Sequence, residues 1–210
     1  MSVSTNRFRV PVTGFDALLD AARAGDGWAF DELFHAWNRP VSGFVRARGV
    51  GDVDGVVNDV FLKAFGAVAS FAGDESAFRA WLFRIARNRV IDEYRKQGRM
   101  PGTVELSAVG EVVGGDVGVE VDERLGGDRV VALLSRLTDE QREVLALRFV
   151  ADLTIDQIAE VTGRRRGAVK QLQRRGLRRL EAILEQGSSC LLYTSPSPRD
   201  QRGSRMPSSA

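Results

Sequence analysis

The sequence predicts an all-α protein made of two small helical domains joined by a flexible acidic linker. Apolar residues recur at helical spacing over residues 15–99 and again over 129–186, and the alternation of apolar and polar residues that is typical of strands is absent. Between these parts, residues 100–128 hold acidic side chains among glycines and valines, and Arg124 is the only base there. The remaining residues, 1–14 and 187–210, are expected to be tails outside the two domains.

The composition fits a soluble, cytoplasmic protein with hydrophobic cores. Of the 210 residues, 43% are hydrophobic and 28% are charged; the net charge is only +2, but acidic and basic residues occupy different regions. No apolar run could span a bilayer and the N-terminus lacks a secretory signal, so we expect no membrane insertion. The single Cys190 and the single His35 leave no zinc ligand set and no catalytic pair, so we expect no metal, no cofactor and no enzyme activity.

Four helical segments are expected in the N-terminal domain. They are FDALLDAARAG (15–25), FDELFHAWNRPVSGFVRARGV (30–50), DVDGVVNDVFLKAFGAVASF (52–71) and FRAWLFRIARNRVIDEYRK (78–96). Pro40 is expected to kink or interrupt the second segment, because proline cannot donate the helical hydrogen bond. The loop before the last segment ends at Asp74 or Ser76, either of which can cap the following helix.

The segment 78–96 interleaves aromatic and arginine side chains along one helix. At helical spacing its residues form three stripes, of which the first is apolar and predicts core, whereas the second and third mix rings and cations. The first contains Phe78, Leu82, Ile85 and Ala86, the second Trp81, Arg84, Asn88 and Arg95, and the third Phe83, Arg87, Val90 and Tyr94. Cations beside flat rings suit a surface for single-stranded nucleic acid, where each stacked base contributes about 1–3 kcal/mol. A buried helix with arginines extending from its edges is the alternative, and the pattern alone leaves both open.

The linker is long enough to let the two domains separate. A flexible coil of about 28 residues has a root-mean-square span of roughly 30 Å and extends to about 90 Å. Its acidic residues are compatible with a passive spacer and equally with a functional negative segment.

The C-terminal domain carries two clear helix starts. After an apolar stripe over residues 130–137, Thr138 is followed three positions later by Gln141, and Thr154 is followed by Gln157. This spacing predicts a capping box at the start of each helix.

Two helices over 154–161 and about 165–184, joined by a short turn that contains Gly163, predict a helix-turn-helix. Its small core is expected to contain Ile155, Ile158, Ala159, Val169, Leu172 and Leu180. Basic residues cluster on its second half, and no acidic residue separates them: Arg164, Arg165, Arg166, Lys170, Arg174, Arg175, Arg178 and Arg179. Such asymmetry favours DNA binding over a merely solvated basic helix, with Arg165, Arg166, Lys170 and Gln171 as candidate base readers and Arg174, Arg175 and Arg178 better placed for phosphate. Gly176 inside the helix is expected to cost up to about 1 kcal/mol relative to alanine.

The tail 187–210 has no sustained period and is rich in Ser, Pro and Arg, so we expect it not to pack. It resembles translated vector sequence more than evolved protein. A native disordered tail is the alternative.

Three segments together resemble the bacterial extracytoplasmic-function (ECF) sigma factors of the sigma-70 superfamily. DVDGVVNDVFLKAF resembles the family's helix for binding core RNA polymerase, and SFAGDESAFRAWLFRIARNRVIDEYRK resembles its promoter-melting segment. LSRLTDEQREVLALRFVADLTIDQIAEVTGRRRGAVKQLQRRGLRRL resembles its helix-turn-helix for the upstream element. The resemblance implies an RNA polymerase sigma factor that recognises the −35 and −10 elements, opens the duplex and initiates transcription.

The resemblance also implies partners and site residues. Core polymerase would be bound at the clamp helices of its largest subunit and the flap of its second-largest subunit, and an anti-sigma factor is a further expected partner. The implied polymerase-binding residues are Asp54, Asn58, Asp59, Phe61, Leu62 and Lys63. The implied −10 residues are Phe71, Asp74, Ser76, Trp81, Arg84, Arg87 and Asn88, with the loop 71–76 walling a pocket for a flipped base. The implied −35 residues are Arg164, Arg165, Arg166, Lys170, Gln171, Arg174, Arg175 and Arg178.

The chain departs from the family pattern at several positions. Gly55 replaces a usual acid, Asn58 and Asp59 replace a common Gln-Glu pair, and Phe65 replaces a frequent Trp, so affinity for core polymerase is expected to differ. Arg165 stands at the usual N-cap serine of the recognition helix, where it cannot accept the free N–H bonds, a loss of about 1 kcal/mol.

A stand-alone helix-turn-helix regulator is the alternative function, since the C-terminal segment also resembles response-regulator output domains. The N-terminal half argues against it, because a receiver domain would alternate strands and helices and this half is helical throughout.

Overall fold

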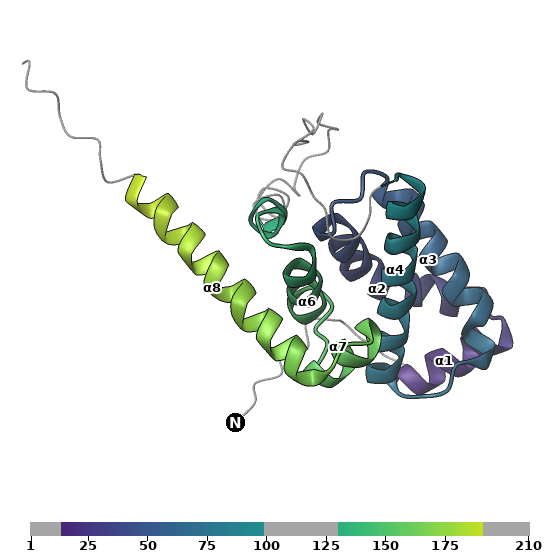
Figure 1. Cartoon of the computed structure of the whole chain (residues 1–210). Coiled ribbons are helices and arrows are strands. Elements are labelled where there is room, and N and C mark those ends of the chain that lie inside the picture. Colours follow the sequence, from purple (N-terminus) through teal and green to yellow (C-terminus); the bar gives the residue numbers. More distant parts are fainter. Residues whose placement is uncertain (1–13, 99–129, 191–210) are drawn as a thin grey trace, which may run out of the picture.

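The computed structural model describes residues 14–98 and 130–190, and every regular element in these ranges is helical, as predicted (Figure 1). The N-terminal helices are α1 Phe15–Ala24, α2 Gly27–Ala47, α3 Val53–Ala67, the 3₁₀ turn η1 Val68–Ser70, and α4 Glu75–Lys96. A helical segment over 130–135 precedes α6 Asp139–Phe149, α7 Ile155–Thr162 and α8 Arg166–Cys190. The predicted linker 100–128 and most of the predicted tail lie outside the described residues.

The N-terminal domain is a bundle in which α4 packs against α2 and α3, and α1 covers α2 and η1. The stripe predicted as core is confirmed, because Phe78, Leu82, Ile85 and Ala86 are all at most 9% exposed. The third stripe is also largely buried, since Phe83 is fully covered and Tyr94 is 7% exposed. α4 therefore has one broad buried face and a narrower polar edge.

Helix boundaries in this domain follow local signals. The carboxylate of Asp74 accepts a hydrogen bond from the backbone N–H of Ala77 at 2.8 Å, so Asp74 is the cap of α4 and Ser76 is not. α2 runs without a break through Pro40, so the interruption considered from the sequence does not occur. Pro40 is buried in the domain, and packing of this helix holds it together despite the one missing N–H donor.

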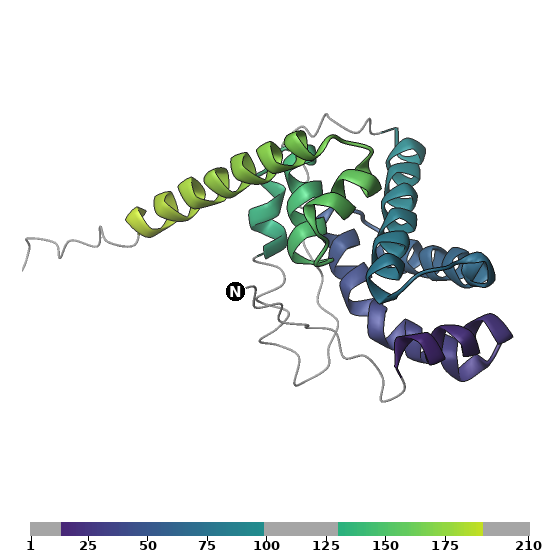
Figure 2. The same ribbon diagram turned by 90° about the horizontal axis from the view of Figure 1, so that it is seen from below.

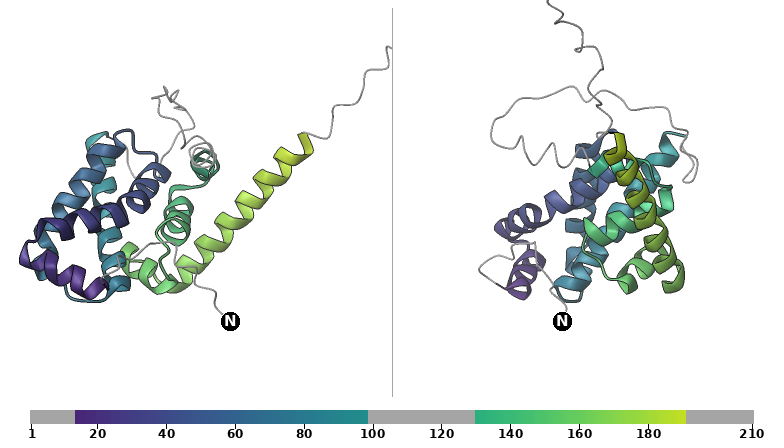
Figure 3. Two further views of the ribbon diagram at one scale, coloured as in Figure 1. Left: turned by 180° about the vertical axis from the view of Figure 1, so that it is seen from behind. Right: turned by 90° about the vertical axis from the view of Figure 1, so that its left-hand side faces the viewer.

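The C-terminal domain also begins its helices where the sequence predicts. Both capping boxes are present, at Thr138 with Gln141 and at Thr154 with Gln157. Gly163 ends α7 with a φ of 69°, the left-handed conformation that a turn of this kind requires. α8 continues to Cys190, past the predicted end at Leu184, and its far half projects away from the other helices (Figures 1 and 3).

Gly176 has a packing role that the sequence does not reveal. A Cβ at this position would lie 2.9 Å from Cδ1 of Leu145, a buried side chain of α6. The close approach of α8 to α6 therefore requires a residue without a side chain.

Replacing Gly176 by alanine is expected to lower the free energy of unfolding by about 1–2 kcal/mol. The overlap with Leu145 costs about 1–3 kcal/mol, and the better helix propensity of alanine recovers up to about 1 kcal/mol. Gly167→Ala in the same helix is the control, since no atom lies within 4 Å of its Cβ position. Urea unfolding should show the first variant destabilised and the second unchanged or stabilised; equal stabilisation of both would contradict the packing role.

The two domains lie against each other in this structure. α7 contacts α4, and α6 contacts α2 (Figure 2). At the second contact a Cβ on Gly43 of α2 would lie 3.0 Å from Cγ1 of Val150, which follows α6. The long linker would allow separation, but the described domains form one continuous buried cluster.

Candidate nucleic-acid and polymerase interfaces

The turn between α7 and α8 and the first half of α8 form a basic surface. Its predicted −35 residues are exposed, apart from the half-buried Arg164: Arg165, Arg166, Lys170, Gln171, Arg174, Arg175 and Arg178. Two of the arginines have carboxylate partners within the domain, since Arg164 lies 2.7 Å from Glu140 and Arg166 lies 2.6 Å from Asp156. The helix-turn-helix therefore presents a dense row of cations on one long helix.

Arg165 lies immediately before α8, at the predicted N-cap position. Its backbone carbonyl accepts the hydrogen bond from Val169 N–H at 3.1 Å, as an N-cap residue does. Its side chain is exposed beside that of Arg166. The guanidinium is therefore free to meet an anion instead of capping the helix.

An aromatic cluster lies at the start of α4. The ring of Trp81 is 5.1 Å from that of Phe71 and 5.4 Å from that of Phe78. Phe78 is buried, whereas Phe71 and Trp81 are half-buried. These two rings thus complete the edge of the core and also offer part of their area to the outside.

The loop that leads into α4 is closed tightly over these rings. Gly73 has a φ of 149°, and a Cβ there would lie 2.8 Å from Cβ of Ala77 and 3.2 Å from Cζ of Phe71. Only glycine fits this turn, so the loop holds Phe71 against Trp81.

The polar edge of α4 contacts the C-terminal domain. No motif in the sequence indicates this contact. Arg84 pairs with Glu160 of α7, and Nε of Arg87 lies 3.1 Å from Glu143 of α6. Gln157 Nε2 donates to the hydroxyl of Ser76 at 2.8 Å. The other members of the predicted −10 set are Phe71 and Trp81 of the aromatic cluster, the helix cap Asp74, and Asn88, which is exposed on α4.

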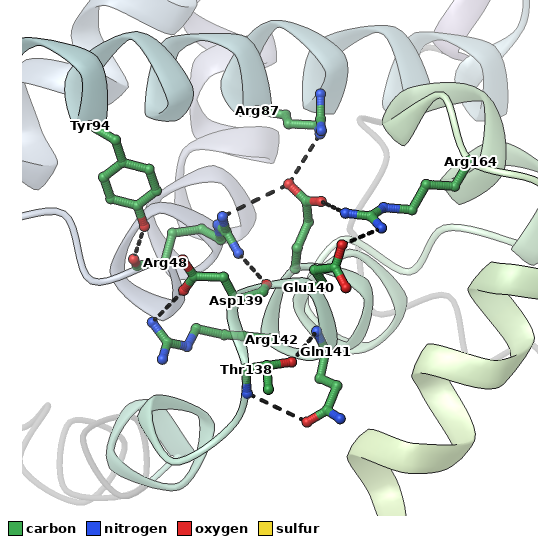
Figure 4. Close-up of polar contacts among 10 residues, drawn as sticks. Arg48, Arg87, Tyr94, Thr138, Asp139, Glu140, Gln141, Arg142 and Arg164 are labelled. Atoms are coloured by element: carbon green, nitrogen blue, oxygen red, sulfur yellow. Dashed lines mark hydrogen bonds and ion pairs between the residues drawn. The ribbon is translucent and has the colours of Figure 1, made fainter. Parts of the chain in front are cut away.

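Glu143 is the centre of a buried ionic cluster between the domains (Figure 4). Its side chain is 5% exposed and lies 3.1 Å from Arg87, 3.9 Å from Arg48 and 3.9 Å from Arg164. Arg48, itself 4% exposed, also donates to the carbonyl of Asp139 at 2.8 Å. Glu143 directly follows Arg142 at the end of the polar first turn of α6, so the sequence carries no signal that its side chain is buried.

Burial perturbs two neighbours of this cluster. It raises the pKa of Tyr94, whose hydroxyl donates to the carbonyl of Arg48. Burial also lowers the pKa of Arg142, although Asp139 acts in the opposite direction. Arg142 donates to the carbonyls of residues 134, 135 and 137 and so fixes the helical segment 130–135 to α6.

The predicted polymerase-binding residues on α3 divide into two groups. Asp54, Asn58 and Leu62 are exposed at spacings of four, so they share one face, and Lys63 is exposed next to it. Leu62 is 72% exposed, the highest exposed fraction among the large apolar side chains of the described residues. This face is the candidate contact.

Phe61 and Asp59 require a different interpretation. Phe61 is 4% exposed and its ring lies 4.8 Å from that of Phe34, so its side chain belongs to the core in this structure, and its contact with polymerase stays a prediction. Asp59 is exposed but pairs with Arg89 of α4 at 2.7 Å.

The structure also gives a reason for the glycine at position 55. A Cβ there would lie 2.2 Å from the carboxylate of Asp52, which caps α3 by accepting from the Gly55 N–H. An acidic residue at this position would have to displace that cap.

Within residues 14–98 and 130–190, no cluster of His, Cys, Asp and Glu side chains could hold a metal ion. No helix in the described part of the chain is both long and apolar enough to cross a membrane.

A two-domain helical fold with a basic helix-turn-helix defines a DNA-binding protein, and comparison with known proteins gives its family. Residues 33–100 match Sigma-70 region 2, and residues 133–182 match Sigma-70, region 4. The RNA polymerase sigma factor CnrH of Cupriavidus metallidurans is 33% identical over 186 residues, which cover 82% of this chain and 96% of CnrH. The ECF RNA polymerase sigma factor BldN of Streptomyces coelicolor is 29% identical over 170 residues, which cover 80% of this chain but only 64% of BldN.

A solved structure supports the same relation. CnrH in complex with the cytosolic domain of CnrY aligns with a TM-score of 0.59 and 28% sequence identity, covering 80% of this chain and 96% of CnrH. The chain belongs to the sigma-70 family and is an RNA polymerase sigma factor of the ECF type. The match of its N-terminal half to region 2 also excludes the stand-alone regulator that the helix-turn-helix alone would allow.

Proposed function

We propose that this sigma factor reads the −35 duplex with α8 and captures the opened −10 strand with α4. The observation that carries the −35 assignment is the row of exposed cations on the turn before α8 and on the first half of α8 itself. In helix-turn-helix proteins the N-terminal residues of the second helix reach base edges in the major groove, which assigns this role to Arg165, Arg166, Lys170 and Gln171. Arg174, Arg175 and Arg178 lie further along α8 and would neutralise phosphates.

The −10 assignment rests on the polar edge of α4, which lies beside the two half-buried rings of Phe71 and Trp81. Arg84, Arg87 and Asn88 would hold the backbone of the non-template strand. Trp81 and Phe71 would offer ring surface to an unstacked base, which offsets part of the few kcal/mol needed to extrude it.

The exposed face of α3 would contact the clamp helices of the largest polymerase subunit. Asp54, Asn58, Leu62 and Lys63 form this face, and the C-terminal domain would meet the flap of the second-largest subunit. CnrH has been solved with the cytosolic domain of CnrY, and we propose that an anti-sigma protein likewise binds this chain. The protein would act in the cytoplasm and leave RNA synthesis to the polymerase.

Neutralising Arg166 or Lys170 tests the assignment of base readers. Arg166→Ala and Lys170→Ala holoenzymes are expected to lose about 1–3 kcal/mol of binding to the cognate −35 duplex, where a bidentate base contact is removed. The cognate sequence is obtained by mapping transcription starts after overexpression of the chain. Arg178→Ala is the control and should weaken binding to cognate and scrambled duplexes alike. Equal losses on both duplexes for Arg166→Ala and Lys170→Ala would show phosphate contacts instead of base reading.

A further inference from the structure

An ion pair joins the two helices of the helix-turn-helix at the start of α8, where base contacts are proposed. Nε of Arg166, the first residue of α8, lies 2.6 Å from a carboxylate oxygen of Asp156 on α7. Both side chains are more than half exposed, and an exposed pair of this kind adds little to stability in water. Its position instead favours a role in DNA recognition.

The atoms of this pair determine what Arg166 can still bind. Nε lies on the inner side of the guanidinium, whereas the two terminal nitrogens lie beyond it at the end of the side chain. Arginine reads guanine through two parallel hydrogen bonds to O6 and N7, and the terminal nitrogens can donate both. A carboxylate at Nε therefore leaves the two-point contact possible while it holds the guanidinium in one orientation.

Arg164, two residues earlier, is engaged in a different way. Its Nη1 lies 2.7 Å from Glu140 and its Nη2 lies 3.9 Å from Glu143, and its side chain is only 28% exposed. Both terminal nitrogens of this guanidinium thus face carboxylates of α6, and a two-point contact with a base would have to break these pairs. Of these two paired arginines, Arg166 is therefore the one suited to base reading.

We propose that Asp156 is a positioning residue that sets the preference of this sigma factor for guanine at the base pair that Arg166 reads. The inference rests on the proposed base reading by Arg166. An arginine side chain loses rotamer freedom when it binds, and a side chain that is already oriented loses less. The carboxylate also repels a phosphate that approaches the same guanidinium. Asp156 thus favours contact with a base edge over contact with the backbone, which carries no sequence information.

Binding of the holoenzyme to −35 duplexes tests this role. Each base pair of the mapped element is replaced in turn, and the position at which Arg166→Ala loses discrimination is the one that Arg166 reads. At this position Asp156→Ala is expected to reduce the preference for guanine about three- to tenfold, part of the full effect of one bidentate contact. Affinity for a scrambled duplex should rise at the same time, because the released guanidinium can reach a phosphate. Discrimination at positions that Lys170 reads should not change.

Opposite changes on the cognate and scrambled duplexes distinguish positioning from other roles. Asp156 lies in the first turn of α7, where a carboxylate also stabilises the helix, and loss of this role alone would weaken binding to every sequence. Glu181→Ala on the exposed part of α8 changes the net charge equally and should leave the preference for guanine unchanged. Asp156→Glu keeps a carboxylate beside Arg166 and should recover most of that preference.

A double-mutant cycle shows whether Asp156 acts through Arg166. In chains that already carry Arg166→Ala, Asp156→Ala should cause no further loss of the preference for guanine. An unchanged preference in the Asp156→Ala chain, or an equal further loss in the double variant, would overturn the role of Asp156 and leave base reading by Arg166 intact. Equal losses on all duplexes for Arg166→Ala would overturn both this inference and the proposed base reader.

Discussion

Glu143→Ala is expected to lower the free energy of unfolding by about 3–5 kcal/mol, because it removes the counter-charge of a buried arginine. Glu143 and Arg48 have side chains that are only 5% and 4% exposed, and Arg87 also pairs with Glu143. Without the carboxylate, Arg48 stays buried beside Tyr94 with no opposing charge at that end. Urea unfolding of the full chain measures the change.

Glu140→Ala is the matched control for this prediction. Glu140 lies on the same helix and pairs with Arg164 at 2.7 Å, but its side chain is 56% exposed. Its loss should change the unfolding free energy by less than about 1 kcal/mol. A similarly small effect for Glu143→Ala would mean that Glu143 is solvent-exposed in solution because the two domains are mostly separated.

Trp81→Ala is expected to weaken the opened promoter complex about 5- to 150-fold, which corresponds to the 1–3 kcal/mol of one stacked base. The closed complex on duplex DNA should keep its affinity, since the cations of α8 do not contact this ring. Permanganate reactivity of thymines in the −10 region measures opening, and a gel shift under conditions that prevent melting measures the closed complex.

Two variants separate stacking from folding in this experiment. Trp28→Ala removes a half-exposed ring from the start of α2 and should leave opening unchanged. Trp81→Phe keeps an aromatic face and should recover most of the opening. Loss of soluble, folded Trp81→Ala protein would show instead that the ring serves the core alone.

Much of the fold could be predicted because its signals are local. The cap at Asp74 and the two capping boxes lie within three residues of the groups they bind, so spacing alone reveals them. The buried stripe of α4 follows from helical periodicity. Pro40 shows the limit of such signals, because tertiary packing keeps α2 continuous through it.

The features that could not be predicted depend on neighbours distant in sequence. The reason for Gly176 lies in its contact with Leu145 of α6, and the burial of Phe61 depends on Phe34 of α2. The pairs of Arg84 with Glu160 and of Arg87 with Glu143 join residues on opposite sides of the linker. No periodicity or motif within either domain indicates that these charges meet.

The sequence also left two interpretations of α4 open, a buried helix or a nucleic-acid surface. The structure supports parts of both, because Phe83 and Tyr94 are buried while Arg84 and Asn88 lie on an exposed edge. Trp81 and Phe71 stand at the boundary between them, which is why variants at these rings are informative.

Run-off transcription with purified core RNA polymerase tests the central claim most directly. Core polymerase alone should start at no defined site on a template that carries a mapped promoter, and addition of the full chain should yield a transcript from one defined start. The free chain should bind the same promoter only weakly. Tight promoter binding by the free protein, with no initiation when core polymerase is present, would contradict the account.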